Sequence, residues 1–124
     1  MDNLKLIAPA IIESIENWLE IKAATSTLAS NTRVAYHNDV TDFFIFLSEH
    51  HNEITQLSTV EKLKISDIRA WQAKLRNMNS GARSNARKLS SLKSYIRWLA
   101  KHRGFDATHI SVSYTHLRAH ETVV

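Results

Sequence analysis

The sequence ARSNARKLSSLKSYIRWLAKHRG, residues 82–104, shows the periodicity of an α-helix. Apolar residues recur in it three and four positions apart, which is the spacing of one helical face. They are Leu89, Leu92, Ile96 and Leu99. Gly104 follows the last turn, where a residue in the left-handed conformation commonly ends a helix. The stretch therefore predicts a helix from about Ala82 to His102 that buries its leucine face.

The opposite side of this predicted helix is basic and carries small hydroxyl side chains. At about 100° per residue, six residues project away from the leucine face. They are Arg83, Arg87, Ser90, Ser91, Ser94 and Lys101. Small side chains let a helix approach a phosphate backbone, and hydroxyls can donate to phosphate oxygens. Two arginines one turn apart also fit the guanine acceptors of a DNA major groove. A solvated helix face is the alternative interpretation.

Charge is distributed unevenly along the 124 residues, whose formal net charge is +4. Residues 1–67 hold five Lys and Arg against ten Asp and Glu, whereas residues 68–105 hold ten Lys and Arg and no acid. A long basic block without acids is the electrostatic pattern expected of a protein that binds a polyanion. This pattern favours nucleic-acid binding over a merely solvated face.

The composition indicates one helical domain. A chain of 124 residues with 44% hydrophobic residues suits a single globular domain. Two glycines and one proline argue against an architecture of many strands joined by tight turns. The absence of cysteine excludes disulfides and thiolate chemistry and fits a reducing, cytoplasmic compartment. The apolar stretch 4–12 is short and contains Pro9, so we expect neither a signal peptide nor a membrane anchor.

Three further helices are predicted before residue 80. They run from about Pro9 to Ala23, from Ser30 to about His50, and from a cap at Ser66 and Asp67 to Asn77. Residues 52–64 are predicted to form a loop with room for a short turn. The residues of these helices that are expected to face the core are Ile11, Ile15, Trp18, Leu19, Tyr36, Val40, Phe43, Phe44, Leu47, Ile68, Trp71, Leu75 and Met78.

Two segments resemble the hallmarks of one family. Residues 30–47, SNTRVAYHNDVTDFFIFL, resemble the T-x-x-x-Y-x-x-D-[LV]-x-x-F-x-x-F-L pattern of tyrosine recombinase N-terminal domains. Residues 80–99, SGARSNARKLSSLKSYIRWL, resemble the basic S-x-x-R-x-L-S-x-L-[RK]-x-[FY] helix that follows a glycine in those domains. The ordered pair lies within a resemblance over about residues 10–108 to Xer-type recombinases and to phage or integron integrases.

The resemblance implies an all-α fold, a SAM-like bundle of four to five helices arranged as two crossing pairs. Residues 1–110 would form this core-binding domain, whose second and fourth predicted helices meet the DNA major groove. The family's groove-facing positions correspond here to Arg83 and Arg87, with Lys88 and Ser91 nearby, and to Thr32 and Arg33 on the second helix. Further candidates for contact with DNA are Ser84, Lys93, Arg97 and Lys101. Of all these residues, Arg83 and Arg87 would supply most base discrimination. Phosphate contacts are expected from Arg33, Lys88, Lys93, Arg97 and Lys101.

Three residues in the matched segments have structural interpretations beside functional ones. Tyr36 is favoured as a partly buried core residue whose hydroxyl is hydrogen-bonded. Asp39 is interpreted as a structural partner for a nearby base. Trp98 either packs against a neighbouring helix or domain or lies against the DNA sugars, and the sequence does not choose between these positions.

No catalytic residue is expected in this chain. Members of the family cut DNA with a tyrosine that lies in a separate C-terminal domain, assisted by arginines, a histidine and a lysine. None of Tyr36, Tyr95 and Tyr114 has the surrounding motif. We expect DNA binding without cleavage, no cofactor or metal, and, in the parent recombinase, a catalytic domain and a tetramer on duplex DNA as partners. A helical protein–protein interaction module with acidic first helices is the alternative function.

Residues 111–124 are expected to be a disordered tail outside the domain. The segment YTHLRAHET, residues 114–122, resembles a cloning-derived read-through sequence. His116 and His120 would need a helix to share a metal ion, and no glutamate base lies between them.

Overall fold

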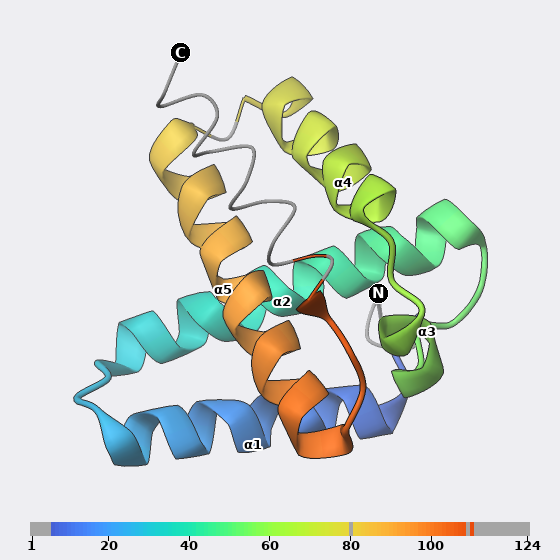
Figure 1. Cartoon of the computed structure of the whole chain (residues 1–124). Helices are drawn as coiled ribbons and strands as arrows, with labels where there is room; N and C mark the ends of the chain where they lie inside the picture. Colours follow the sequence, from blue (N-terminus) through green and yellow to red (C-terminus); the bar gives the residue numbers. More distant parts are fainter. Residues whose placement is uncertain (1–5, 80, 109, 111–124) are drawn as a thin grey trace.

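The computed structural model describes residues 6–79, 81–108 and 110. Figure 1 shows that this part of the chain is built from helices. They are α1 (Pro9–Thr25), α2 (Ser30–His51), α3 (Leu57–Glu61), α4 (Ile65–Asn77) and α5 (Ala82–Arg103). The all-α prediction is confirmed, and each of the four long helices begins and ends within about two residues of its predicted bounds.

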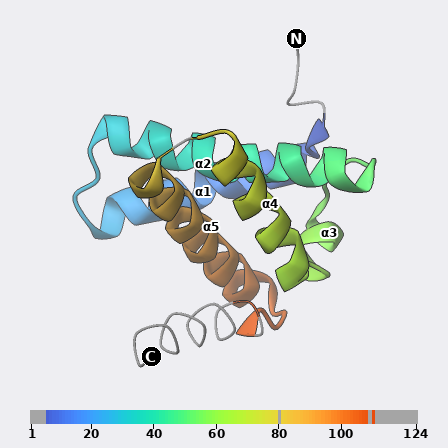
Figure 2. The ribbon, with the colours of Figure 1, turned by 90° about the horizontal axis from the view of Figure 1, so that it is seen from above.

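The long helices form two pairs that cross. α1 and α2 lie side by side, and α4 and α5 form the second pair, which crosses the first (Figures 1 and 2). Aromatic rings fill the crossing point. The ring of Tyr95 on α5 meets Trp18 of α1 edge-on at 5.6 Å and Phe44 of α2 at 5.7 Å between centroids. This arrangement confirms the predicted SAM-like bundle of two crossing pairs.

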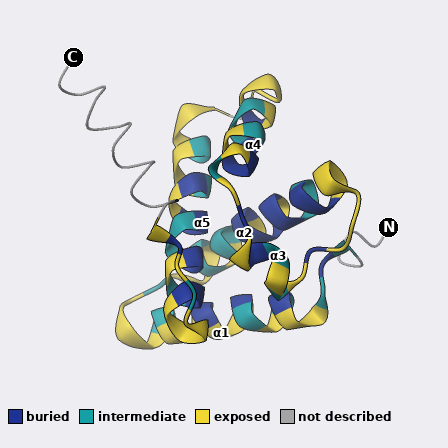
Figure 3. Cartoon of the chain, turned by 45° about the vertical axis from the view of Figure 1, so that its right-hand side comes forward, coloured by how far each residue is buried: buried dark blue, intermediate teal, exposed yellow. Residues whose placement is uncertain are grey.

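Helical periodicity explains which faces form the core. Buried residues line the facing sides of the helices, and exposed residues lie on their outer sides (Figure 3). The predicted core residues are buried except for Met78, which is 62% exposed, and Tyr36, which is half-buried as predicted. The Tyr36 hydroxyl, which is predicted to be hydrogen-bonded, has no hydrogen-bond partner within the described residues. The prediction for Met78 is wrong because α4 ends at Asn77, so that Met78 lies in the C-cap rather than on the buried face.

The predicted loop at 52–64 contains the short helix α3. A reciprocal capping box between Gln56 and Thr59 starts this helix, which buries its own Val60, and Leu63 just after it is also buried. The cap of α4 differs from the prediction, which places it at Ser66 and Asp67, because the N-cap residue is Lys64. Asp67 accepts a hydrogen bond from the Lys64 backbone N–H at 3.1 Å, so this carboxylate caps the helix from its third position.

Glycines delimit the basic helix. Gly81, with φ 92°, precedes α5, and Gly104, with φ 81°, ends it as predicted. The Gly104 N–H donates to the Ala100 carbonyl at 2.7 Å. Among the described helices, none is long and apolar enough to cross a lipid bilayer.

Candidate nucleic-acid interface

A buried carboxylate on α2 joins that helix to α5. Asp39 is fully buried and accepts two hydrogen bonds from Arg87, from Nε to Oδ2 at 2.9 Å and from Nη2 to Oδ1 at 2.8 Å. Ser91 Oγ donates to Oδ2 at 3.2 Å, and Lys88 Nζ lies 3.5 Å from Oδ1. Paired, charge-assisted hydrogen bonds of this kind are strong and directional. The prediction that Asp39 is a structural partner for a base is confirmed.

The pair fixes the position of the arginine side chain and favours its charged form. Hydrogen bonding to Asp39 raises the pKa of Arg87 above its ordinary value, although burial acts in the opposite direction. A guanidinium has five N–H donors, of which this geometry uses Nε–H and one on Nη2. The side chain of Arg87 remains 44% exposed, so its other N–H groups stay available at the surface.

Three residues that are predicted to contact DNA also bond to carboxylates of α2. Asp39 occupies the Nε–Nη2 edge of the Arg87 guanidinium, which leaves the N–H groups of Nη1 and the second N–H of Nη2 for an outside ligand. Ser91 does not lie on the outer face, since it is 4% exposed and its hydroxyl donates to Asp39. Lys88 is 16% exposed and lies 3.5 Å from both Asp39 and Asp42, so its charge is directed toward α2. All three contacts arise because α2 crosses α5 here.

The outer side of α5 carries a further group of cations. We call this surface the α5 basic face, and it comprises Arg83, Arg87, Ser90, Ser94, Arg97 and Lys101. Arg83, Arg97 and Lys101 are exposed and form no ion pair with any described residue. Arg103, a second paired arginine of this helix, lies on the opposite side, where its Nε donates to Glu61 at 3.3 Å.

The other predicted contacts lie beside this face or on α2. Ser84 is half-buried in the first turn of α5, and Lys93 is half-buried further along the helix. Thr32 and Arg33 are half-buried in the first turns of α2. The exposed cations of the described region thus lie mainly on α4 and α5, and α2 adds the half-buried Arg33.

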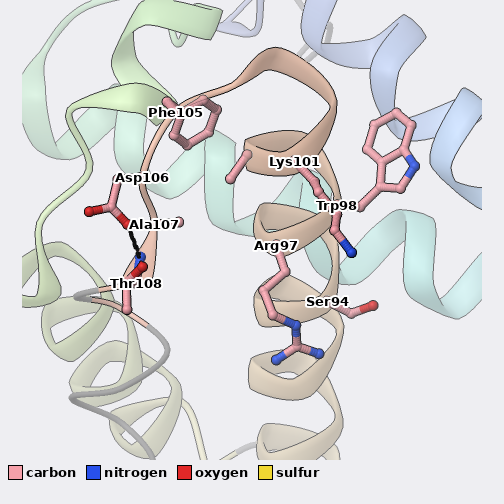
Figure 4. A pocket seen from close by; sticks show the side chains of 9 residues that line it. Ser94, Arg97, Trp98, Lys101, Phe105, Asp106, Ala107 and Thr108 are labelled. Atoms are coloured by element: carbon pink, nitrogen blue, oxygen red, sulfur yellow. Dashed lines mark hydrogen bonds between the residues drawn. The ribbon is translucent and has the colours of Figure 1, made fainter.

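A groove of about 560 Å³ continues the α5 basic face toward the end of the helix. Figure 4 shows that Ser94, Arg97 and Lys101 project from α5 on one side of this groove and that Phe105 lies on the other. Trp98 borders it and stacks on His102 at 5.0 Å with an interplanar angle of 7°. Trp98 is half-buried, which agrees with packing against its own helix and α1.

The tyrosines of the described region are structural. Tyr95 is fully buried, and its hydroxyl lies 2.6 Å from Ser14 Oγ. Burial raises the pKa of Tyr95 to about 12, which disfavours the phenolate that a nucleophile would need. Tyr36 stacks on Trp18 at 6.3 Å. Tyr114, His116 and His120 lie outside the described residues, among which no cluster suits a metal ion.

Helix pairing and the α5 basic face define a small helical domain of the kind that the sequence resemblance implies. The phage integrase N-terminal SAM-like domain family matches residues 15–103 of the chain. The chain therefore belongs to this family. No solved structure gives a significant match.

Curated relatives agree with the family match. The chain is 33% identical over 102 residues to tyrosine recombinase XerC of Brucella suis, which covers 80% of this chain and 32% of the relative. It is 32% identical over 92 residues to XerC of Rickettsia typhi, covering 74% of this chain and 30% of the relative. XerC of Agrobacterium fabrum is 32% identical over 98 residues. The chain spans about a third of the length of these relatives.

Proposed function

We propose that this chain is a double-stranded DNA-binding domain of a site-specific tyrosine recombinase, with strand cleavage performed by a catalytic domain outside residues 1–110. The observation that carries the proposal is the α5 basic face, where Arg83, Arg97 and Lys101 are exposed without carboxylate partners among the described residues. Exposed, uncompensated cations along one helix are the charge pattern expected of a surface that binds DNA phosphates. Family membership supports the same function.

The structure refines the role of each residue in this proposal. Arg83 lies in the first turn of α5 with its guanidinium free, so it becomes the main candidate for reading bases. Arg97, Lys101 and Arg33 would contact phosphates and fix the register. Arg87 serves first to hold α2 against α5 through Asp39. In the parent recombinase, the domain would work in the cytoplasm beside a catalytic domain and other protomers of a tetramer.

Replacement of Arg83 tests base reading. Arg83→Ala should weaken binding to a selected duplex site by about 1–3 kcal/mol and relax the preference at one base pair. Arg103→Ala is the matched control, because Arg103 lies on the opposite side of the same helix and is paired with Glu61. Affinity and site selection on random duplexes give the readout. An unchanged base preference in Arg83→Ala would contradict the assigned role.

A helical protein-interaction module remains the alternative. Its prediction differs, because such a module needs no affinity for duplex DNA. Absence of binding at low salt would support it, whereas affinity that falls steeply with added salt supports the DNA-binding proposal.

A further inference from the structure

A small cavity lies where α1, α2 and α5 meet, beside the Arg87–Asp39 pair. Its volume is about 150 Å³. This is below the range of roughly 300–1,000 Å³ that is usual for pockets holding whole small molecules. Its lining residues are Trp18, Lys22, Tyr36, Arg87, Ser90, Ser91 and Ser94. A single small group, rather than a complete nucleotide, fits these dimensions.

The lining is cationic and rich in hydrogen-bond donors. Lys22 contributes a positive charge, whereas the charge of Arg87 is largely balanced by Asp39, which lies outside the lining at 2.8 Å from Nη2. The hydroxyls of Tyr36, Ser90 and Ser94 have no hydrogen-bond partner within the described residues. Positive charge combined with several free donors is the chemistry that recognises a phosphate group.

Both cations are held in place by neighbouring side chains. Asp39 accepts from Nε and Nη2 of Arg87 and so orients the guanidinium, whose other N–H groups have no partner within the described residues. Lys22 Nζ lies 6.0 Å from the centroid of the Trp18 ring, and Trp18 itself stacks on Tyr36. Donors that are already oriented lose less conformational freedom when a ligand binds.

We propose that this cavity binds one backbone phosphate of duplex DNA, with Lys22 and Arg87 as its cations and Ser90 and Ser94 as hydroxyl donors. The cavity shares Arg87, Ser90 and Ser94 with the α5 basic face, so a duplex bound to that face would bring a phosphate to the cavity. The assignment of this phosphate to DNA therefore rests on the proposed function. The inference adds α1 to the DNA interface. It makes Lys22 a contact residue although it belongs to the acidic part of the sequence.

Salt dependence of duplex binding tests the proposal. Each phosphate neutralised by a cation adds about 0.9 to the slope of log K against log salt. Lys22→Ala should therefore reduce the slope by about one, and Lys22→Arg should retain it. Lys62→Ala is the matched control, since Lys62 is an exposed lysine at the end of α3, outside the cavity. Circular dichroism melting of each variant checks that the fold is intact.

Replacing single phosphates of the duplex with neutral methylphosphonates shows which phosphate the cavity binds. A scan of single methylphosphonates along the duplex should find one position that weakens the wild type but has little further effect on Lys22→Ala, as in a double-mutant cycle. An unchanged slope in Lys22→Ala, with steep salt dependence in the wild type, would overturn the cavity proposal and leave DNA binding standing. No salt-dependent binding by the wild type would instead refute the proposed function.

Inorganic phosphate separates the two sources of the ligand. At matched ionic strength, we expect phosphate and chloride to give the same melting temperature for the wild type. A phosphate-dependent rise that Lys22→Ala abolishes, together with an unchanged DNA slope, would show a site for free phosphate and contradict the DNA assignment.

Discussion

Asp39 receives donors from three side chains of α5, and this single contact distinguishes Arg87 from the other arginines of the same face. Its carboxylate is completely buried, whereas the Arg87 side chain is 44% exposed. Removing the arginine leaves a buried charge with weaker compensation from Ser91 and Lys88. Stability and DNA affinity are thus coupled at Arg87 but not at Arg97.

Arg87→Ala should lower the free energy of unfolding by about 1–3 kcal/mol, a value discounted from that of a fully buried pair because half of the side chain meets solvent. Arg97→Ala should change it by less than about 0.5 kcal/mol, since Arg97 is exposed and unpaired within the described residues. Urea denaturation measures both variants. Equal stability of the two would contradict the structural role of the Asp39 pair.

Tyr95 links stability to alkaline pH. Its pKa is raised to about 12 by burial, against about 10 in an unfolded chain. A group whose pKa is raised on folding stabilises the protein below the unfolded value, and this contribution is lost as pH rises from 10 to 12. Between pH 9 and 11, the wild type should lose about 1 kcal/mol more stability than Tyr95→Phe. Parallel pH profiles of unfolding would contradict the assignment.

The two glycines that delimit α5 differ in the conformations they need. A Cβ at either position would meet no atom within 4 Å, so any cost of substitution comes from the backbone. Gly104 has φ 81° and ψ 34°, a left-handed conformation that Asn tolerates. Gly81 has φ 92° and ψ 141°, a region that side-chain-bearing residues rarely occupy.

Gly104→Ala should cost about 1 kcal/mol, and Gly104→Asn should recover part of that loss. Gly81→Ala should cost more, up to about 3 kcal/mol, with no recovery in Gly81→Asn. Thermal unfolding of the four variants gives the comparison. Recovery by Asn at both sites would contradict the conformational difference between the two helix ends.

The long helices could be predicted because each has a wide apolar face and a recognisable end. The spacing of the leucines was enough to predict which face of α5 is buried, and Gly104 indicated where the helix ends. α3 was missed because five residues are too few to establish a helical period. Met78 continued the spacing of α4 past the point where the helix ends.

Predicting the site was harder, since it depends on how helices cross. The sequence indicated a basic side of α5, but the crossing of α2 decides that Ser91 is buried and that Arg87 is paired. Lys22 was missed because it lies in a helix rich in acidic residues. The sequence does hold one indication of where Lys22 lies, because Trp18 precedes it by one helical turn and the Lys22 ammonium lies over the Trp18 ring.

Taken together, the described helices place exposed cations without ion-pair partners among the described residues on α4 and α5, and acidic residues mainly on α1 and α2. A body with such a charge asymmetry should bind a polyanion through one face, and binding should release counterions from the DNA. Because counterion release does not depend on base sequence, the salt dependence of binding can be measured before the target site is known.

Equilibrium binding of the 124-residue chain to an arbitrary duplex across a series of salt concentrations therefore decides whether the protein is a DNA-binding domain. We predict that log K falls linearly with log salt, with a slope on the order of −3 to −5 from the contacts of Arg33, Arg83, Arg97, Lys101 and Lys22. A slope near zero, or no binding at low salt, would contradict DNA binding through the α5 basic face.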